Sequence, residues 1–263
     1  MAAFTLIELS IVLVIIGLIV GGVLVGQDLI RSAEIRSTLT QIERYNTAAN
    51  TFIGKYGCLP GDCANATTFW GLSNQCSINN NPFGSNTCNG DGNGQISSAF
   101  TGSGNSIAHS ETILFWQQLG LAGLIAPING SVNAAYAPNA PTAPLQNTCI
   151  SIAYGFPDDG TIAGAQFDIS ATSRVAGHFF RLGNPAQPDG QTNDCLGPAL
   201  APITALRIDQ KLDDGVPTTG VVLTEFWMGW YGTSACAVTS GSSYVYDLSK
   251  ATPICALVIK ASF

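Results

Sequence analysis

Oxygen-bearing side chains alternate along one short segment of the chain, at Asn89, Asp91, Asn93 and Gln95. With Gly94 at the sixth position they match the first part of an EF-hand-type loop, because Ca²⁺ takes about six to eight oxygen ligands and the glycine permits a sharp turn. The twelfth position is Phe100 rather than glutamate, so completing a calcium site would require Glu111 to fold back. An ordinary Asn/Gly turn explains the loop equally well. We expect no required cofactor, and Ca²⁺ only at this loop.

The eight cysteines are the other residues whose spacing carries chemistry, at positions 58, 63, 76, 88, 149, 195, 236 and 255. No Cys-x-x-Cys pair is present and the only histidines are His109 and His178, which excludes zinc fingers and c-type haem attachment. An even cysteine count predicts disulfides formed in an oxidising compartment. Many connectivities are open to eight cysteines. We favour pairing in sequence order, as Cys58–Cys63, Cys76–Cys88, Cys149–Cys195 and Cys236–Cys255.

The sequence carries no signature of catalysis and no basic surplus. It lacks Gly-x-Ser-x-Gly, a Walker loop and His-Glu-x-x-His, the motifs that indicate a serine hydrolase, an NTPase or a zinc protease. We therefore expect the protein not to be an enzyme. Ten Lys+Arg against 17 Asp+Glu give a formal net charge of −7. A chain with this balance does not neutralise phosphates, so we expect no nucleic-acid partner.

The strongest hydropathy signal is an apolar run from Leu9 to Gly26 that is interrupted only by Ser10. At a rise of about 1.5 Å per residue, a helix of this length spans about 27 Å, close to the hydrocarbon thickness of a bilayer. A buried core helix normally keeps a polar face, and a secretory signal has a shorter apolar region with a small-residue cleavage site. Neither pattern fits, and we expect a transmembrane half over residues 4–26.

One charge lies at the edge of this run, at Glu8, and a carboxylate in lipid is costly unless it is paired. The stretch around it reads Phe4-Thr5-Leu6-Ile7-Glu8-Leu9-Ser10-Ile11-Val12. This stretch resembles the start of a mature type IV pilin or type II secretion pseudopilin. The resemblance implies cleavage between Ala3 and Phe4 by a prepilin peptidase, and N-methylation at Phe4. It also implies that Glu8 pairs with the N-terminal amine of a neighbouring subunit, and opposite charges attract strongly in a low-dielectric bundle.

The first three residues depart from that family's pattern. They read Met-Ala-Ala, with alanine at the cleavage position where the family usually has glycine, and without a basic residue. Arg31, Arg36 and Arg44 all follow the apolar span, and the positive-inside rule then places the C-terminal part in the cytosol. The disulfide prediction places it outside the cytosol. We therefore expect residues 1–3 to be the remnant of a longer, basic leader.

The apolar run continues into an amphipathic pattern with no proline before Pro60. Hydrophobic residues recur at spacings of three and four on one helical stripe, at Ile35, Leu39, Ile42, Tyr45, Ala49, Phe52 and Tyr56. We expect one long helix over residues 4–56 that stops at Gly57. Its first half would lie in the membrane or filament core, and its second half would lie against a globular domain.

Glycines interrupt the apolar half of this expected helix, at Gly17, Gly21, Gly22 and Gly26. Small residues allow close packing between helices, which would make these glycines assembly residues. Glycine also lowers helix propensity by about 1 kcal/mol relative to alanine, and the resemblance implies local melting during assembly. The second interpretation predicts that residues 17–26 are helical in the membrane and non-helical in a filament. Both interpretations stay open.

Residues 57–263 form the expected head, and the expected fold class is α+β: the long helix, a disulfide-rich domain with a small antiparallel sheet, and at least one further helix. The helix signal covers Glu111–Ile125, with Pro127 beyond its end. Short runs bounded by Gly, Pro, Asn or Asp predict strands, at Cys149–Tyr154, Gln166–Ile169, His178–Leu182, Ala205–Ile208, Val221–Thr224 and Ala256–Ala261. The stretches Leu59–Asp62, Phe115–Leu119 and Asp209–Pro217 resemble large pseudopilin-like proteins.

These expectations favour a structural role. The resemblance implies a subunit of a type IV pilus or pilus-like extracellular filament, a helical homo-oligomer held by its N-terminal helices. Before assembly the subunit would lie in the bacterial inner membrane and engage the prepilin peptidase and a filament assembly platform. Glu8 favours the body of the filament, because a tip subunit has no subunit above it to pair with. Two alternatives stay open: a pseudopilin of a periplasmic type II secretion pseudopilus, and a minor or tip pilin that binds a partner through its large head.

Overall fold

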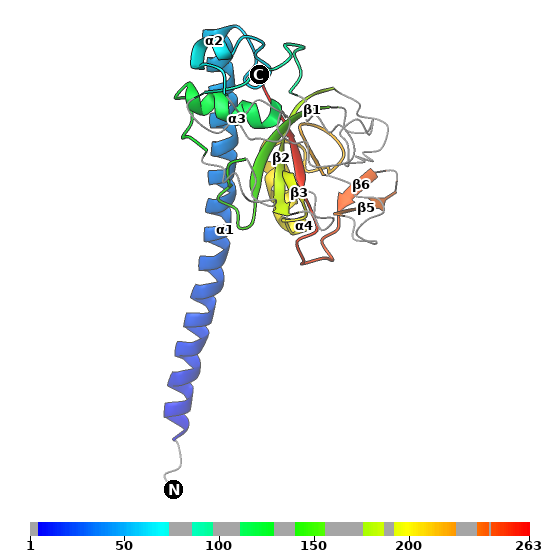
Figure 1. The fold of residues 1–263 in the computed structure, drawn as a ribbon. Coiled ribbons are helices and arrows are strands. Elements are labelled where there is room, and N and C mark those ends of the chain that lie inside the picture. The colour runs from blue at the N-terminus through cyan, green and yellow to red at the C-terminus, as the bar shows by residue number, and fades with distance from the viewer. Residues whose placement is uncertain are drawn as a thin grey trace.

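The computed structural model describes residues 5–73, 86–96, 111–128, 140–155, 176–186, 192–224, 236–241 and 243–263. A 51-residue helix, α1 (Leu6–Tyr56), precedes a head whose described helices are α2 (Thr67–Trp70), α3 (Glu111–Leu121) and α4 (Pro202–Leu212). The described strands are β1 (Cys149–Gly155), β2 (Gly177–Ala186), β3 (Thr192–Gly197), β4 (Val222–Thr224), β5 (Ala237–Ser240), β6 (Ser243–Tyr246) and β7 (Leu257–Lys260). Figure 1 shows α1 as a shaft with the head on its C-terminal half. The architecture is α+β.

Helix α1 is bounded by capping residues at both ends. Thr5 is the N-cap and forms a capping box with Glu8, which satisfies donors that the first turn leaves unpaired. At the other end Gly57 has φ 72° and its N–H donates to the carbonyl of Ile53. A left-handed residue of this kind is accessible to glycine without a Cβ clash. The helix therefore ends at the glycine that the sequence predicts as its stop.

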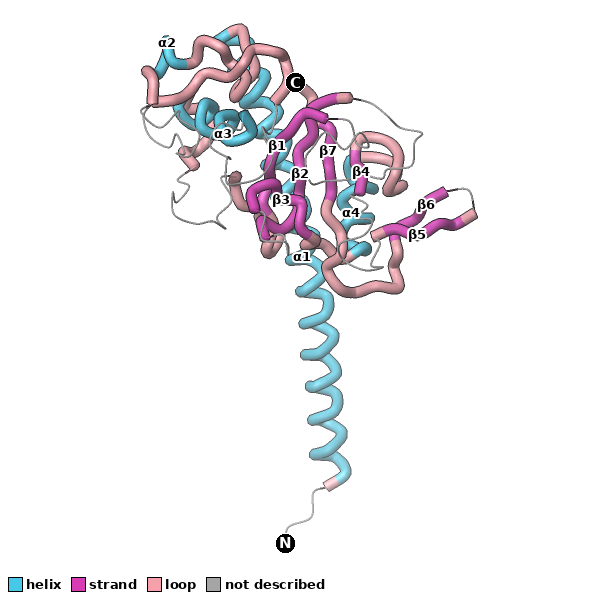
Figure 2. Tube along the Cα trace, turned by 45° about the vertical axis from the view of Figure 1, so that its right-hand side comes forward, coloured by secondary structure: helices cyan, strands magenta, loops and turns pink. Residues whose placement is uncertain are grey.

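The outer half of α1 supplies one wall of the core. Six residues of the predicted stripe are buried and Tyr56 is half-buried. The opposite wall is an antiparallel sheet in the order β1-β2-β7-β4, with β3 paired to the far end of β2. Phe180 on β2 points toward α1, with its ring centroid 6.4 Å from that of Tyr45, and the Trp116 ring of α3 lies 4.8 Å from Tyr45. Figure 2 shows the strands side by side next to α1.

The head corrects one of the strand predictions. Residues Ala205–Ile208 lie inside helix α4 and are not a strand. Pro202 occupies the first turn, where its fixed φ suits a helix and its missing N–H costs nothing. Ala205 and Ile208 are buried together on one face, as the spacing of three allows in a helix. The predicted strand Gln166–Ile169 lies outside the described residues.

The other four strand predictions fall on β1, β2, β4 and β7 to within a few residues, and helix Glu111–Ile125 ends earlier, at Leu121. The sequence did not predict β3, β5 and β6. Strands β5 and β6 form a separate hairpin. The Tyr246 hydroxyl of that hairpin donates to Asp209 of α4 at 2.7 Å. Burial raises the pKa of Asp209 to about 6, against the opposing effect of the Tyr246 bond.

Candidate functional site

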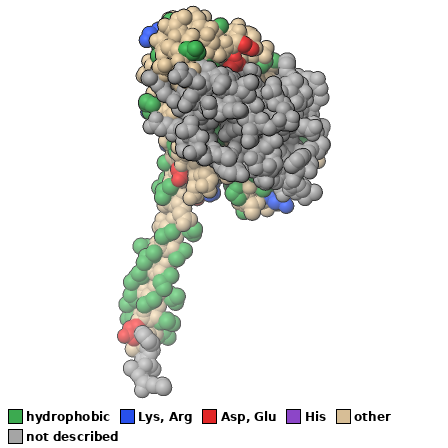
Figure 3. All heavy atoms as spheres, viewed as in Figure 1, with side chains coloured by type: hydrophobic (Ala, Val, Ile, Leu, Met, Phe, Trp, Pro, Cys, Tyr) green, Lys and Arg blue, Asp and Glu red, His purple; other side chains and the backbone are tan. Residues whose placement is uncertain are grey.

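The inner half of α1, residues 6–30, is an apolar surface that the rest of the chain leaves uncovered. Its large hydrophobic side chains are 51–88% exposed, from Ile16 to Leu6. An 18-residue window of this helix has a mean hydropathy of 2.9, and none of that window is buried. In the described chain α1 is the helix long and apolar enough to cross a membrane. Figure 3 shows hydrophobic side chains along the length of this half.

The carboxylate of Glu8 is held at the start of this surface by Thr5. The backbone N–H of Thr5 donates to Glu8 Oε2 at 2.8 Å, and the Thr5 hydroxyl donates to the same oxygen at 2.7 Å. The N–H of Glu8 donates in return to Thr5 Oγ1 at 3.4 Å. Glu8, the single acidic side chain of α1 before Asp28, is thus fixed in the first turn of the helix. The predicted cleavage and methylation residues, Ala3 and Phe4, lie outside the described residues.

The glycines of the inner half are helical, and open space surrounds them. A Cβ added at Gly17, Gly21, Gly22 or Gly26 would meet no other atom within 4 Å. No contact within the described chain therefore requires glycine at these positions. Each glycine still lowers the helix propensity by about 1 kcal/mol relative to alanine. Close helix packing through these glycines and local melting of the helix during assembly both remain predictions.

The structure contains disulfides in the predicted order. The bonds Cys58–Cys63, Cys149–Cys195 and Cys236–Cys255 are formed, with Cα–Cα distances of 5.2, 5.4 and 5.0 Å. Cys88 is also disulfide-bonded, whereas its predicted partner Cys76 lies outside the described residues. These bonds join β1 to β3 and tie the segment after β4 to the start of β7. A buried, cross-linked head agrees with an oxidising compartment.

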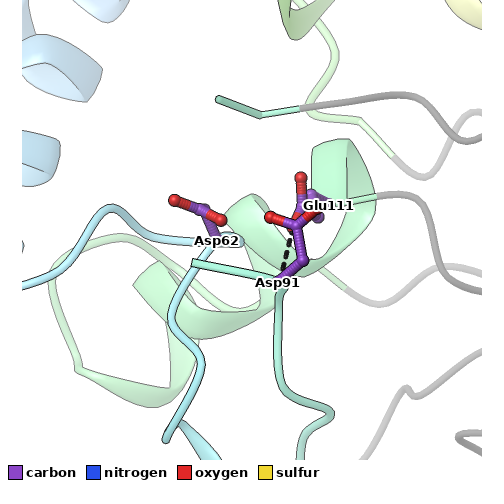
Figure 4. A group of neighbouring side chains, drawn as sticks. All are labelled: Asp62, Asp91 and Glu111. Carbon is purple, nitrogen blue, oxygen red and sulfur yellow. Dashed lines mark hydrogen bonds between the residues drawn. The ribbon is translucent and has the colours of Figure 1, made fainter. Parts of the chain in front are cut away.

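Three carboxylates from separate segments meet at the distal end of the head. Ligand oxygens of Asp62, Asp91 and Glu111 all lie within 4.8 Å of one another. Asp62 comes from the loop after α1, Asp91 from the segment 86–96, and Glu111 from the first turn of α3 (Figure 4). Glu111 Oε1 accepts the backbone N–H of Asp91 at 3.0 Å. The structure thus brings together Asp91 and Glu111, the pair that the calcium prediction requires.

Asp62 organises the loop that the sequence singled out. Its Oδ1 accepts the N–H groups of Gly92 and Asn93 at 2.7 and 3.1 Å, and its Oδ2 accepts that of Gly94 at 2.8 Å. Asp91 Oδ1 accepts the N–H of Asn93 at 3.0 Å, and Asn93 Oδ1 accepts that of Gln95 at 2.7 Å. The loop is therefore wrapped around a carboxylate supplied from about 30 residues earlier in the chain.

The carboxylate group keeps Asp91 and Glu111 of the predicted ligands and adds Asp62, whereas the predicted Asn89, Asn93 and Gln95 are not part of it. Asn89 Oδ1 accepts the backbone N–H of Thr67 at 2.9 Å, so this side chain is turned toward α2 and belongs to a different contact. Asp62 takes its place beside Asp91. The sequence signal for Asp62 was its position in Leu-Pro-Gly-Asp, next to a glycine in a turn. That signal indicates a turn residue, and nothing in it indicates which distant loop the carboxylate meets.

Two glycines allow the segments to approach one another. Gly61 has φ +88°, and a Cβ there would lie 2.3 Å from the carbonyl oxygen of Glu111. A Cβ at Gly90 would lie 2.4 Å from the Cα of Asp62. Both distances are far below ordinary contact, so a larger residue at either position would push the loops apart. The carboxylate group depends on these two positions as much as on its own side chains.

Within this group, burial affects the ionisation of Asp62. Burial raises the pKa of Asp62, and the bond from the Gly94 N–H opposes the rise; the neighbouring Asp91 side chain adds to it. A divalent cation would favour the ionised forms of these carboxylates, because carboxylate oxygens are the ligands that Ca²⁺ prefers. Asp62, Asp91 and Glu111 are the residues able to hold it. The spacing of their oxygens permits one cation to contact all three.

His178 occupies an apolar site that does not resemble a catalytic one. Its Nε2 accepts the backbone N–H of Ile96 at 3.2 Å, and its ring lies against those of Tyr154 and Phe263. Burial lowers its pKa to about 4. The ring is therefore neutral at pH 7 and acts as an acceptor that anchors the end of segment 86–96 to the sheet. His109 lies outside the described residues.

Comparison with protein-family models, with curated proteins and with solved structures gives no match for this chain.

Proposed function

We propose that this protein is a structural subunit of a type IV pilus or related filament, inserted in the bacterial inner membrane before it is assembled. The observation that carries the proposal is the division of α1: residues 6–30 are apolar and uncovered, while the outer half is built into the head. An apolar surface of this length needs lipid or other apolar helices around it. Parallel packing of many such helices supplies that cover in a filament.

Glu8 and the glycines fit this assembly. Glu8 is the single charged residue before Asp28, and an isolated carboxylate among apolar helices is costly. An N-terminal amine from a neighbouring copy would neutralise it, in the way that the pilin resemblance implies. Glycines surrounded by open space would let neighbouring helices approach closely. These properties support a subunit that adds into the body of a filament.

The size of the head favours a second candidate. Residues 57–263 carry several disulfides and a separate β5–β6 hairpin, more structure than anchoring a helix requires. A type II secretion pseudopilin, or a minor or tip pilin, would use such a head to bind a partner. The location then would be a periplasmic pseudopilus or the filament tip.

Electron microscopy of sheared surface filaments, followed by peptide identification, tests the first proposal. We expect the chain to be the main component of the filaments, and we expect Glu8→Ala to abolish them while the protein remains in the membrane. Ser10→Ala is the matched control and should assemble, because the Ser10 hydroxyl is satisfied by the carbonyl of Ile7. A chain found only in inner-membrane complexes would overturn the major-subunit proposal and favour the pseudopilin.

We also propose that the head binds Ca²⁺ through Asp62, Asp91 and Glu111. Their convergence from three segments supports this site over an ordinary turn. Isothermal titration of Ca²⁺ into the full-length protein in detergent should show binding that Asp62→Asn and Asp91→Ala each remove. Asn89→Ala should bind as the unmodified protein does, since that side chain faces Thr67. Absence of binding heat from the unmodified protein would return the loop to a structural turn.

A further inference from the structure

Charge is distributed unevenly between the long helix and the head. Residues 1–56 contain four basic and four acidic residues, whereas residues 57–263 contain six basic and thirteen acidic ones. The whole net charge of −7 therefore belongs to the head. Heads of identical copies that lie side by side repel one another. A basic surface that contacts the acidic head of a neighbouring copy would reduce this repulsion.

The exposed side of α1 carries such a surface beside the head. Arg36, Arg44 and Lys55 are exposed, while the side facing the sheet is apolar. Their separations of 8 and 11 residues keep them on one side of a helix. We call these three residues the basic stripe. Glu43 is the single acidic residue between positions 35 and 56, so the stripe has a net positive charge.

The arginines of the stripe are available to a partner. In the described part of the chain neither Arg36 nor Arg44 takes part in an ion pair or a side-chain hydrogen bond. Lys55 lies over the ring of Tyr56, with Nζ 5.0 Å from the ring centroid. Exposed arginine is well suited to this role, because its planar group forms paired hydrogen bonds with carboxylates.

The acidic end of α4 lies at a matching position on a displaced copy. Arg207 of α4 pairs with Asp28 of α1 at 3.7 Å, which places α4 at the end of the head nearer the N-terminus (Figure 1). Asp213 and the exposed Asp214 directly follow α4. Arg36 and Arg44 lie 8 and 16 residues beyond Asp28. Arg207, which lies six residues before Asp213, is the residue of α4 that pairs with Asp28, so displacing a parallel copy along the helix axis moves the α4 of that copy along the stripe.

We propose that the basic stripe of one copy is the contact surface for the acidic end of α4 in a second copy. This inference rests on the proposed filament, because parallel, staggered helices are what bring the two surfaces to one level. The contact joins opposite charges where neighbouring heads would otherwise repel. It also gives each copy two different contact surfaces, one basic and one acidic. Repeated contacts of this type can build an open helical array.

Charge reversal tests the stripe. We expect Arg36→Glu with Arg44→Glu to reduce the yield of sedimentable filaments by at least tenfold, while membrane insertion and the thermal unfolding of the head stay unchanged. The matched control is Lys250→Glu with Lys260→Glu, which makes the same change in net charge at two exposed lysines of the head and should assemble normally. Equal filament yields from the two double variants would overturn the inference.

Cross-linking identifies the partner surface. A photoreactive benzophenone residue at exposed Thr40, between the two arginines, should form intermolecular cross-links to peptides that contain Asp213 and Asp214. The yield of these cross-links should fall between 0.1 and 1 M salt, because screening shortens the Debye length from about 10 Å to about 3 Å. Cross-links confined to α1 of the second copy would overturn the proposed contact.

Failure of the inference is distinguishable from failure of the proposed function. If the unmodified protein forms no filaments, the proposed function fails and this contact fails with it. If the unmodified protein and the Arg36→Glu, Arg44→Glu variant polymerise equally well, the filament proposal stands and only the contact is rejected.

Discussion

The two halves of α1 belong to one continuous helix, yet they are stabilised in opposite ways. Hydrophobic side chains between residues 6 and 30 are 51–88% exposed, whereas the stripe from Ile35 to Phe52 is at most 9% exposed. Burial of apolar surface contributes about 25 cal/mol per Å², and only the outer half receives it from its own chain. In the proposed function, the inner half obtains the same contribution from lipid or from other copies. The outer half of α1 is thus covered by its own chain, whereas the large apolar side chains of the inner half are exposed.

The largest expected effect separates the two halves directly. Phe52 is fully buried and contacts the rings of Tyr56 and Trp70, so Phe52→Ala should reduce the free energy of unfolding by about 3–5 kcal/mol. Leu18→Ala, in the inner half, should change it by less than about 0.5 kcal/mol. Denaturant titration in detergent, followed by tryptophan fluorescence, measures both. Similar losses from the two variants would contradict the division of the helix.

Removal of disulfides should weaken the head without affecting the inner half. The Cys149–Cys195 bond closes 46 residues and Cys58–Cys63 closes five. Loop-closure entropy then predicts losses of about 4 and 2 kcal/mol when each pair is replaced by alanine. Thermal unfolding followed by near-ultraviolet circular dichroism should preserve this order. A loss of helical signal from residues 6–26 in micelles would show a coupling that the contacts of the described chain do not provide.

Acid should destabilise the head through His178. Its pKa in the folded state, about 4, lies below the unfolded value of 6.5, so the unfolded state binds the proton more tightly. The contribution of His178 to the free energy of unfolding is therefore fully present above pH 6.5 and is lost as the pH falls toward 4. The loss is about 2 kcal/mol once the partial exposure of the ring is allowed for. His178→Gln keeps an acceptor for the Ile96 N–H and should remove this component of the pH dependence. His109→Gln is the control, and an equal effect there would reject the assignment to His178.

The smallest effect concerns the glycines of the inner half. Gly21→Ala should raise the stability of the helix in the isolated subunit by about 1 kcal/mol, because a Cβ at this position meets open space. If copies pack through this position, the same change should reduce filament yield. Circular dichroism in micelles and sedimentation of filaments measure the two results. A loss of stability in micelles would place the glycine in a contact within the chain.

Much of the fold follows from local pattern. The stripe from Ile35 to Phe52 predicts the buried face of α1, and Gly57 predicts its end, because periodicity and capping act between residues a few positions apart. Four of the six predicted strands lie on described strands. The strand predicted at residues 205–208 was wrong. A short apolar run of this kind fits either a strand or one face of a helix. Pro202 and the packing of α4 against β4 and the β5–β6 hairpin select the helix.

The residues of the candidate sites also fall into two groups, those that the local sequence predicts and those that only the fold brings together. Glu8, the apolar run and the alternating oxygens of segment 89–95 are readable in the sequence, because each is defined by neighbours along the chain. The carboxylate of Asp62 is not, since its partners lie about 30 residues away. The approach of Gly61 to α3 and of Gly90 to Asp62 brings them together.

Chain order thus fixes the helix, its apolar half and the spacing of potential ligands, because these depend on local geometry and on the transfer of side chains out of water. The fold decides which loops meet, which face of α1 remains exposed and which carboxylate lies beside Asp91. Those outcomes depend on contacts between distant segments, whose favourable energy must exceed the entropy of closing the loops between them. A local sequence pattern therefore does not predict the balance between contact energy and loop-closure entropy.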